Sequence, residues 1–244
     1  NRTLVKYGLV VLAQTKRFGL QELMRMAGIK PILNQKLFIT NLDTHTLGYI
    51  LGPRLNAAGR MDHANDAYRL LITKSKEEAG NLAKKLNEKN QERQRLTNKI
   101  IQEIEAKIKI KEEKLVFEGD ENWPIGIVGL IAGRLRDRYY RPSLIYQKMK
   151  NISKGSARSI DSFNIVEAIS DCKELLEDFG GHPAAAGFTV SNKNLEKFRK
   201  KLLKIAEKSI KKEDLIPALN IDLEVEPEDL SFEAYEEIQR FAPF

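Results

Sequence analysis

The sequence predicts an α/β protein, with a helical N-terminal part, a long connecting helix and a second part built on a small mixed β-sheet flanked by helices. Three observations predict this class. Residues 1–73 carry short helical patterns broken by Gly and Pro, and neither residue type occurs from Asn81 to about Glu113. After Lys114, strand and helix patterns alternate. We therefore expect parts at residues 1–73, 74–113 and 114–212, with 213–244 opening a further unit.

The composition is typical of a folded globular protein with a basic surface. Of 244 residues, 42% are hydrophobic and 31% are charged, the formal net charge is +7 and the pI is near 9.3. This charge fits a polyanionic partner, although many lysine-rich proteins have it without one. The single cysteine, Cys172, excludes a disulfide framework and a thiolate metal cluster, and its apolar neighbours predict a core position on a helix. No apolar run approaches the roughly 18 residues of a membrane span.

The N-terminal part contains four segments with helical apolar spacing. They are Arg2–Ala13, Leu20–Ala27, Leu42–Leu51 and Asp66–Ile72. Between the last two lies "GPRLNAAGRMDHA", which its Gly and Pro residues predict to be irregular. The chain starts at Asn1 without Met and stops within "QRFAPF", so it looks like an excerpt from a longer protein.

The long helix is predicted to begin at Ser75, with Glu78 completing a capping box. It would be roughly 50 Å long at 1.5 Å per residue. Its apolar residues form two patches, at 79–86 and 96–108, and the stretch from Asn87 to Arg95 between them is polar all round. Apolar ends and a wet middle predict a bridge between two packed bodies. The alternative is a helix lying along a single domain.

The elements after Lys114 make up the predicted α/β domain. They are a strand at 114–120, a helix at 124–140, a strand at 142–148, an extended segment at 153–160, a helix at 164–180 ended by Gly180, a strand at 184–190 and a helix at 194–212. A further strand is predicted within 218–231, followed by a helix at Phe232–Arg240.

The phrase "KGSARS" has the chemistry of a phosphate-binding segment. Gly155 permits close backbone approach, the hydroxyls of Ser156 and Ser159 are donors, and the Arg158 guanidinium matches a phosphate. In an extended chain Lys154, Ser156 and Arg158 share one face, and Ser159 points the other way. The alternative is a solvated edge strand.

Two other phrases are candidates for anion binding. In "GPRLNAAGR", Arg54 and Arg60 flank Asn56, and both arginines could grip phosphates unless their guanidinium groups bond to carbonyls of the same loop. In "GGHPAAAG", which runs from Gly180 to Gly187, His182 could donate to a phosphate or stack on a base. The alternative there is a helix C-cap followed by an internally bonded histidine.

The sequence offers little for metal binding or bond breaking. "MDHAND" brings Asp62, His63 and Asp66 together, and a solvated cluster explains it better than a metal site. No Ser-His-Asp, Cys-His or paired-carboxylate arrangement is present. The residues therefore predict binding chemistry without a catalytic centre.

Three phrases, "GPRLNAAGRMDHA", "GSARSI" and "FGGHPAAAGFTV", in this order and spacing, resemble the RecJ family of single-stranded-DNA exonucleases in the DHH phosphoesterase superfamily. "NRTLVKYGL", "NWPIGIVGLIAGRLRDRYYRP" and "FAPF" resemble the same family, so the likeness covers nearly the whole chain. "GGH" with "AAG" alone would indicate only the broader DHHA1 domain.

The resemblance implies a two-body enzyme with two divalent metal ions, Mn²⁺ or Mg²⁺, in an N-terminal DHH domain. Residues 1–73 would end that domain, 74–113 would be the connecting helix, 114–212 would be the DHHA1 domain and 213–244 would begin an OB-like domain. The Asp-His-His segment would precede Asn1, so no metal ligand is expected in this chain. One departure is Pro124 after Trp123, where the family usually has His, so no role for that histidine carries over.

The resemblance also implies roles for individual residues. Ser156 and Arg158 would hold phosphates near the 5′ end of the strand, Arg54 would contact the DNA backbone, and Gly181 and His182 would face the scissile region. The predicted nucleic-acid contacts are Arg54, Asn56, Arg60, Lys154, Ser156, Arg158 and Ser159.

The leading prediction is thus part of a 5′→3′ single-stranded-DNA exonuclease of DNA repair or recombination, with this chain alone inactive. The alternatives are a phosphodiesterase of the same superfamily acting on oligonucleotides or cyclic dinucleotides, and a non-catalytic nucleic-acid-binding relative. Single-stranded DNA is the predicted partner, and a single-strand-binding protein or a helicase is a further one. We expect a cytoplasmic monomer without membrane contact.

Overall fold

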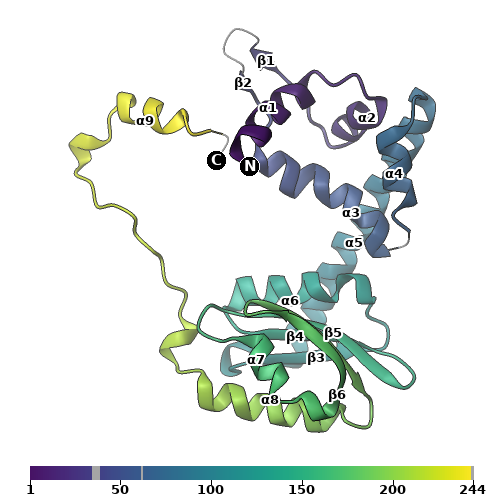
Figure 1. Ribbon diagram of the computed structural model, residues 1–244, viewed down its shortest axis with the longest axis vertical. Coiled ribbons are helices and arrows are strands. Elements are labelled where there is room, and N and C mark those ends of the chain that lie inside the picture. The colour runs from purple at the N-terminus through teal and green to yellow at the C-terminus, as the bar shows by residue number, and fades with distance from the viewer. Residues whose placement is uncertain (35–38, 62, 243–244) are drawn as a thin grey trace. The chain divides into compact units, whose positions relative to one another are not determined.

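The computed structural model describes residues 1–34, 39–61 and 63–242, and the chain forms two compact units (Figure 1). One unit consists of Asn1–Glu92 together with the stretch from Asn220, and the other consists of Arg93–Leu219. The division falls inside one long helix, α5 (Lys76–Lys107), which therefore belongs to both units.

The first unit is mainly helical, as predicted. Its elements are α1 (Arg2–Ala13), α2 (Phe18–Met26), β1 (Leu33–Asn34), β2 (Ile39–Thr40), the π-helix η1 (Thr46–Leu51), α3 (Gly52–Met61), α4 (Asn65–Ile72) and the start of α5. The core of this unit joins buried side chains from α1, α2, η1, α3, α4 and α5, among them Leu9, Leu23, Leu51, Leu70 and Leu86.

The stretch from Gly52 to Met61 is helical, so the prediction of an irregular segment was wrong. Gly52 continues the helix of η1, and the following Pro53 lies where the π-helical turn passes into α3. Ala57 and Ala58 are fully buried, which brings α3 close to its neighbours. Packing of small residues therefore outweighs the helix-breaking tendency of Gly and Pro here.

The long helix α5 confirms the predicted start but corrects two details. The Ser75 hydroxyl accepts a hydrogen bond from Glu78 N at 3.2 Å, but the Glu78 carboxylate binds Arg69 and the Thr73 hydroxyl rather than completing a capping box. The polar middle is also not solvated all round, because Asn87, Asn90 and Arg93 on one side are only 8%, 2% and 7% exposed, while the other side of the stretch is exposed. Burial of these side chains requires polar partners, and Asn87 has one in Arg54.

The second unit contains the predicted mixed sheet. Its strands are β3 (Val116–Asp120), β4 (Ser143–Lys148), β5 (Ile152–Arg158), β6 (Leu176–His182) and β7 (Ala185–Ser191), in the spatial order β3-β4-β5-β7-β6. Only β3 and β4 pair in parallel, and every other pair is antiparallel. β5 is therefore an interior strand, which corrects the alternative of a solvated edge strand.

Helices lie on both faces of this sheet (Figure 1). α6 (Ile125–Tyr139) packs on β4 and β5 from one side. α7 (Ile165–Ser170) and α8 (Leu195–Ser209) cover the other side, which we call the closed sheet face. Three rings meet there, with Phe198 lying 5.6 Å from Phe117 and 5.3 Å from Phe188 between ring centroids.

The helix predicted for 164–180 was wrong beyond its first two turns. α7 ends at Ser170, a short 3₁₀ turn spans Lys173–Leu175, and the chain then pairs as β6 with β7. Cys172 is fully buried as predicted, although it follows α7 instead of lying in a helix. "DFGGHPAAAGFTV" is therefore a β-hairpin, and Gly180 lies in a strand instead of capping a helix.

The C-terminal stretch contains two 3₁₀ turns, Glu213–Leu215 and Pro227–Asp229, and helix α9 (Phe232–Gln239). The strand predicted within 218–231 does not form in this part of the structure. The predicted final helix is confirmed. Among the described residues, no helix is both long enough and apolar enough to cross a membrane.

Candidate nucleic-acid interface

The side of the sheet opposite α7 and α8 is only partly covered, and we call its uncovered part the open sheet face. In an antiparallel sheet, residues directly paired across strands project to the same side. The register places these residues together: Lys154, Ser156 and Arg158 of β5, Ala185, Gly187 and Thr189 of β7, and Asp178, Gly180 and His182 of β6. Two phrases that the sequence separates by some twenty residues therefore form one surface.

Two neighbouring glycines, Gly180 and Gly187, leave a strip of this face without side chains, which we call the lane. Gly187 pairs with Ser156 on one side and with Gly180 on the other, and both glycines are exposed. A Cβ added at Gly180 would meet nothing within 4 Å, and one added at Gly187 would meet only the Gly155 carbonyl oxygen at 3.9 Å. Neither glycine has a positive φ. Packing and backbone conformation therefore do not require glycine at either position.

Ser156 and Arg158 are half-buried beside the N-terminal half of α6. Arg158 Nη1 donates to the Ser156 hydroxyl at 2.8 Å and to the Ala157 carbonyl at 2.7 Å. A Cβ added at Gly129 of α6 would lie 3.1 Å from Ser156 Oγ and 3.3 Å from Arg158 Nη2. The absence of a side chain at Gly129 thus lets the helix approach the pair and hold the guanidinium in one orientation. A fixed guanidinium with an adjacent hydroxyl suits a phosphate oxygen.

His182 is exposed at the end of β6, immediately before the hairpin turn. The turn is held by backbone bonds, since the Pro183 and Ala184 carbonyls accept from Ile165 N at 3.0 Å and Ser159 N at 2.9 Å. Gly181 has a φ of +156°, and a Cβ there would lie 2.3 Å from the Ala185 carbonyl oxygen. Glycine at position 181 is therefore required by the backbone, and it sets the close pairing that positions His182.

Ser159 is fully buried, in contrast to the other predicted contacts. Its hydroxyl donates to the Phe163 carbonyl at 2.6 Å, and its own carbonyl accepts from Arg136 Nη1 at 3.3 Å. These bonds fix the loop after β5. The Ser159 hydroxyl thus has an internal partner, and we leave it out of the open sheet face.

Arg54, Asn56 and Arg60 lie on α3 in the first unit. Arg54 Nε donates to Asn87 Oδ1 at 3.1 Å and its Nη1 donates to the Ile50 carbonyl at 2.6 Å, so its guanidinium joins α3 to α5. Burial lowers the pKa of Arg54 from its ordinary value. Asn56 and Arg60 are exposed on the other side of the helix. Arg54 thus matches the alternative in which its guanidinium bonds to a nearby carbonyl, and not the prediction that it binds a phosphate.

The described residues contain no group of three or more His, Cys, Asp or Glu side chains arranged to hold a metal ion. Of the predicted acidic cluster, Asp62 lies outside the described residues. Asp66 Oδ2 pairs instead with Lys85 Nζ at 2.8 Å and with Lys89 Nζ at 3.7 Å. Asp66 therefore forms ion pairs from α4 to α5 instead of facing a metal ion.

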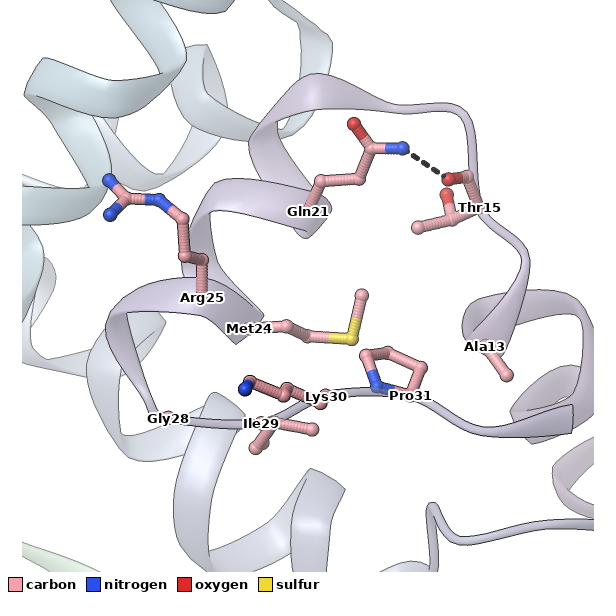
Figure 2. Close-up of a pocket in the computed structure, with 9 residues that line it drawn as sticks. All are labelled: Ala13, Thr15, Gln21, Met24, Arg25, Gly28, Ile29, Lys30 and Pro31. Atoms are coloured by element: carbon pink, nitrogen blue, oxygen red, sulfur yellow. Dashed lines mark hydrogen bonds between the residues drawn. The ribbon is translucent and has the colours of Figure 1, made fainter.

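A separate cavity of about 420 Å³ lies between α2 and the loop after it (Figure 2). Its lining residues are Ala13, Thr15, Gln21, Met24, Arg25, Gly28, Ile29, Lys30 and Pro31. Gln21 closes one wall by donating to the Thr15 carbonyl at 2.8 Å, and Arg25 pairs with Glu22 at 2.7 Å. None of the residues predicted to bind nucleic acid lines this cavity.

Three members of the open sheet face were not predicted, namely Asp178, Gly180 as a strand residue, and Thr189. In "DFGGH" and "AAGFTV" every second residue faces the open side of the sheet. This pattern could identify the face only if both segments were first recognised as strands. Gly129 was also missed. Gly129 and Gly133 lie four residues apart on the side of α6 that faces Arg158, a spacing that favours close helix packing.

Comparisons with known proteins found relatives of this chain in sequence and in structure. The DHHA1 domain family matches residues 98–211. The single-stranded-DNA-specific exonuclease RecJ of Bacillus subtilis (strain 168) is 36% identical over 248 residues, which cover 100% of this chain and 30% of that protein. The RecJ exonuclease of Thermus thermophilus is 30% identical over 190 residues, 78% of this chain and 26% of that protein.

The same likeness is found among solved structures. A crystal structure of RecJ in complex with Mg²⁺ from Thermus thermophilus matches 100% of this chain and 36% of its own, with a TM-score of 0.84 and 27% identity. A crystal structure of exonuclease RecJ bound to manganese matches 85% of this chain and 50% of its own, with a TM-score of 0.69 and 28% identity. The chain thus spans 30% of the length of the Bacillus subtilis relative and 26% of the length of the Thermus thermophilus relative.

Proposed function

Because this chain is a homologue of RecJ and carries a DHHA1 domain, we propose that it supplies single-stranded-DNA binding to a 5′→3′ exonuclease. The open sheet face is the proposed binding surface. Ser156 and Arg158 hold phosphate near the 5′ end of the strand, and Gly181 positions His182 toward the scissile region.

The observation that carries this proposal is the pair of exposed glycines, Gly180 and Gly187. Glycine in a strand weakens the strand, and it commonly marks a place where a ligand or another backbone approaches closely. The lane that these glycines form runs beside the Ser156 hydroxyl and the Arg158 guanidinium. A flexible, negatively charged backbone fits a narrow lane with a cationic wall. Asp178, at the far end of the face, opposes Lys154 across Thr189 and would repel phosphate there.

Metal ions belong to the related structures, which were crystallised with Mn²⁺ or Mg²⁺. The described residues of this chain do not fit such a site, since they bring no three metal-ligating side chains together. We therefore derive no metal-dependent step for them, and cleavage would depend on other residues. We propose that the chain alone binds DNA and does not cut it.

The proposal is tested by fluorescence anisotropy of the 244-residue chain with a 5′-phosphorylated single strand across a salt series. Duplex DNA, short RNA and a cyclic dinucleotide serve as competitors. Arg158→Ala should weaken single-strand binding by about 10- to 150-fold, because it removes a charge-assisted hydrogen bond worth about 1.5–3 kcal/mol. It should also flatten the salt slope by about 0.7, the value for one phosphate contact on a single strand.

Lys204→Ala is the matched control, because Lys204 is an exposed cation on α8, which covers the closed sheet face. Equal weakening by both substitutions would overturn the assignment, since only net charge would then matter. Preference for the cyclic dinucleotide would favour a different substrate class. Degradation of DNA by the pure chain in the presence of Mn²⁺ would contradict the proposal that the chain alone binds DNA and does not cut it.

The remaining expectations stay predictions. These are a monomeric state, a cytoplasmic location, and a single-strand-binding protein or helicase as a further partner.

A further inference from the structure

An exposed pair of stacked rings lies on the first unit, on the helix that leads into α3. The His45 and Tyr49 rings have centroids 5.1 Å apart and planes inclined by only 14°. Tyr49 is 76% exposed, and His45 is exposed as well. Stacking on one side leaves most of the tyrosine surface open to solvent.

The local backbone fixes this pair. Asp43 caps the start of the helix, because its Oδ1 accepts from Thr46 N at 2.7 Å and from the Thr46 hydroxyl at 2.6 Å. These two bonds lower the pKa of Asp43, the side-chain bond contributing more. Gly52 N then donates to the Leu47 carbonyl and closes a π-helical turn. A Cβ at Gly52 would lie 2.7 Å from that carbonyl oxygen, so the turn requires glycine.

The stacked rings belong to a longer solvent-facing stripe. Helical spacing of three and four residues aligns one side of the continuous helix, along His45, Tyr49, Pro53, Asn56 and Arg60. The opposite side carries the buried Leu51 and Ala58, and Arg54 bonds from α3 to α5. The core therefore holds the helix from behind and presents the stripe outward.

We propose that this stripe is a second contact for single-stranded nucleic acid, with a nucleobase stacked on Tyr49 and the backbone passing Asn56 and Arg60. The inference rests on the proposed function and names a site outside the open sheet face. Bases of any type stack on aromatic side chains, so the contact adds affinity without sequence preference. The stacked His45 ring supports Tyr49 in the orientation that a base would meet.

The charge and composition of this stripe favour a nucleic acid over a protein as its partner. The stripe itself carries one arginine, Arg60, and no Asp or Glu, and the nearest preceding acidic residue, Asp43, is bonded to Thr46 as the helix cap. The stripe also offers one large exposed aromatic residue followed by polar side chains, in contrast to the continuous apolar face that a protein partner would need. A single ring beside cationic and amide groups matches the composition of a single-strand binding surface.

The test uses the full 244-residue chain and single strands that carry 2-aminopurine at successive positions, because the fluorescence of this base falls when it stacks. Tyr49→Leu should lower single-strand affinity about tenfold and abolish the quenching at one position, since a stacked base contributes about 1–3 kcal/mol. Tyr49→Phe keeps the ring and should retain both. The salt slope should stay unchanged in Tyr49→Leu and fall by about 0.7 in Arg60→Ala.

Tyr68→Leu is the matched control, because Tyr68 is 62% exposed on α4 of the same unit and takes no part in the stack. Equal losses in Tyr49→Leu and Tyr68→Leu, or full affinity and quenching in Tyr49→Leu, would overturn the inference. Failure of the wild-type chain to bind single strands would instead defeat the proposed function. Retained binding that falls only with Arg158→Ala would leave the proposed function standing and remove the stacking site.

Discussion

The two faces of the five-stranded sheet are made from alternate residues of the same strands, yet their packing is opposite. On the closed sheet face, Phe117, Phe188 and Phe198 fill the space under α8 at ring distances of 5.3–6.1 Å. On the open sheet face, Gly180 and Gly187 leave space that no protein atom fills. The packed core and the proposed binding surface thus lie on opposite sides of the same strands, so one residue step along β7 separates a core substitution from a surface one.

The largest effect should come from Phe198→Ala. The Phe198 side chain is fully buried between two other rings, and removing it leaves a cavity. We expect the free energy of unfolding of the second unit to fall by about 3–5 kcal/mol. Urea denaturation followed by the near-ultraviolet signal measures it, with Lys204→Ala on the exposed side of α8 as the control. A loss below about 1 kcal/mol would show that the closed face is not the main core.

Gly155→Ala should be next, because Gly155 is on β5 but points to the closed face. Its new Cβ would lie 2.4 Å from the Phe188 ring and 2.8 Å from the Ile145 carbonyl oxygen. The ring can shift but the backbone carbonyl cannot do so easily, and overpacking of this kind costs about 1–3 kcal/mol. We expect a lower midpoint of thermal unfolding. Unchanged stability would mean that this part of the core is looser than its distances indicate.

Gly187→Val sharpens the comparison, because Gly187 faces the open side. Valine favours strands, and the nearest protein atom to its Cβ would be 3.9 Å away, so the stability of the unit should not fall. Its side chain would fill the proposed lane, and single-strand affinity should drop about tenfold, as for loss of about 1.4 kcal/mol. Anisotropy and thermal unfolding measured on the same sample separate the two effects. A stable variant that binds DNA normally would contradict the assignment of the lane.

Much of this architecture could be predicted from the sequence, and the failures have physical causes. The spacing of apolar residues found α1, α5, α6 and α8, because each helix buries one stripe. It mistook β6 for the end of a helix, because Leu175, Leu176 and Phe179 also fit helical spacing. Pairing with β7, a contact between segments, overrides that local pattern.

The candidate site was predicted in parts. "KGSARS" and "GGH" were found because Gly, Ser, Arg and His carry recognisable chemistry. Their meeting on one surface depends on the β5-β7-β6 register, which no local pattern specifies. The burial of the Ser159 hydroxyl and the bond from Arg54 to Asn87 depend on tertiary contacts in the same way.

The smallest effect concerns Cys172, which lies on the closed side of the sheet. Burial raises the pKa of its thiol to about 11, well above the ordinary value of about 9. A raised pKa means that the folded state holds the proton more tightly than the unfolded state. This contribution to stability is complete below about pH 9 and is lost as the pH rises toward about 11. Unfolding free energies of the wild type should therefore fall over that window more steeply than those of Cys172→Ala.

Alkylation gives an independent measurement of the same burial. Iodoacetamide at about pH 8 should leave Cys172 of the native chain unmodified and should react readily after addition of urea, because the reactive thiolate is scarce and shielded in the folded state. Rapid native-state labelling would mean that the closed face opens to solvent. The contrast between a sealed and an open side of the sheet would then describe an average over moving states instead of one packed structure.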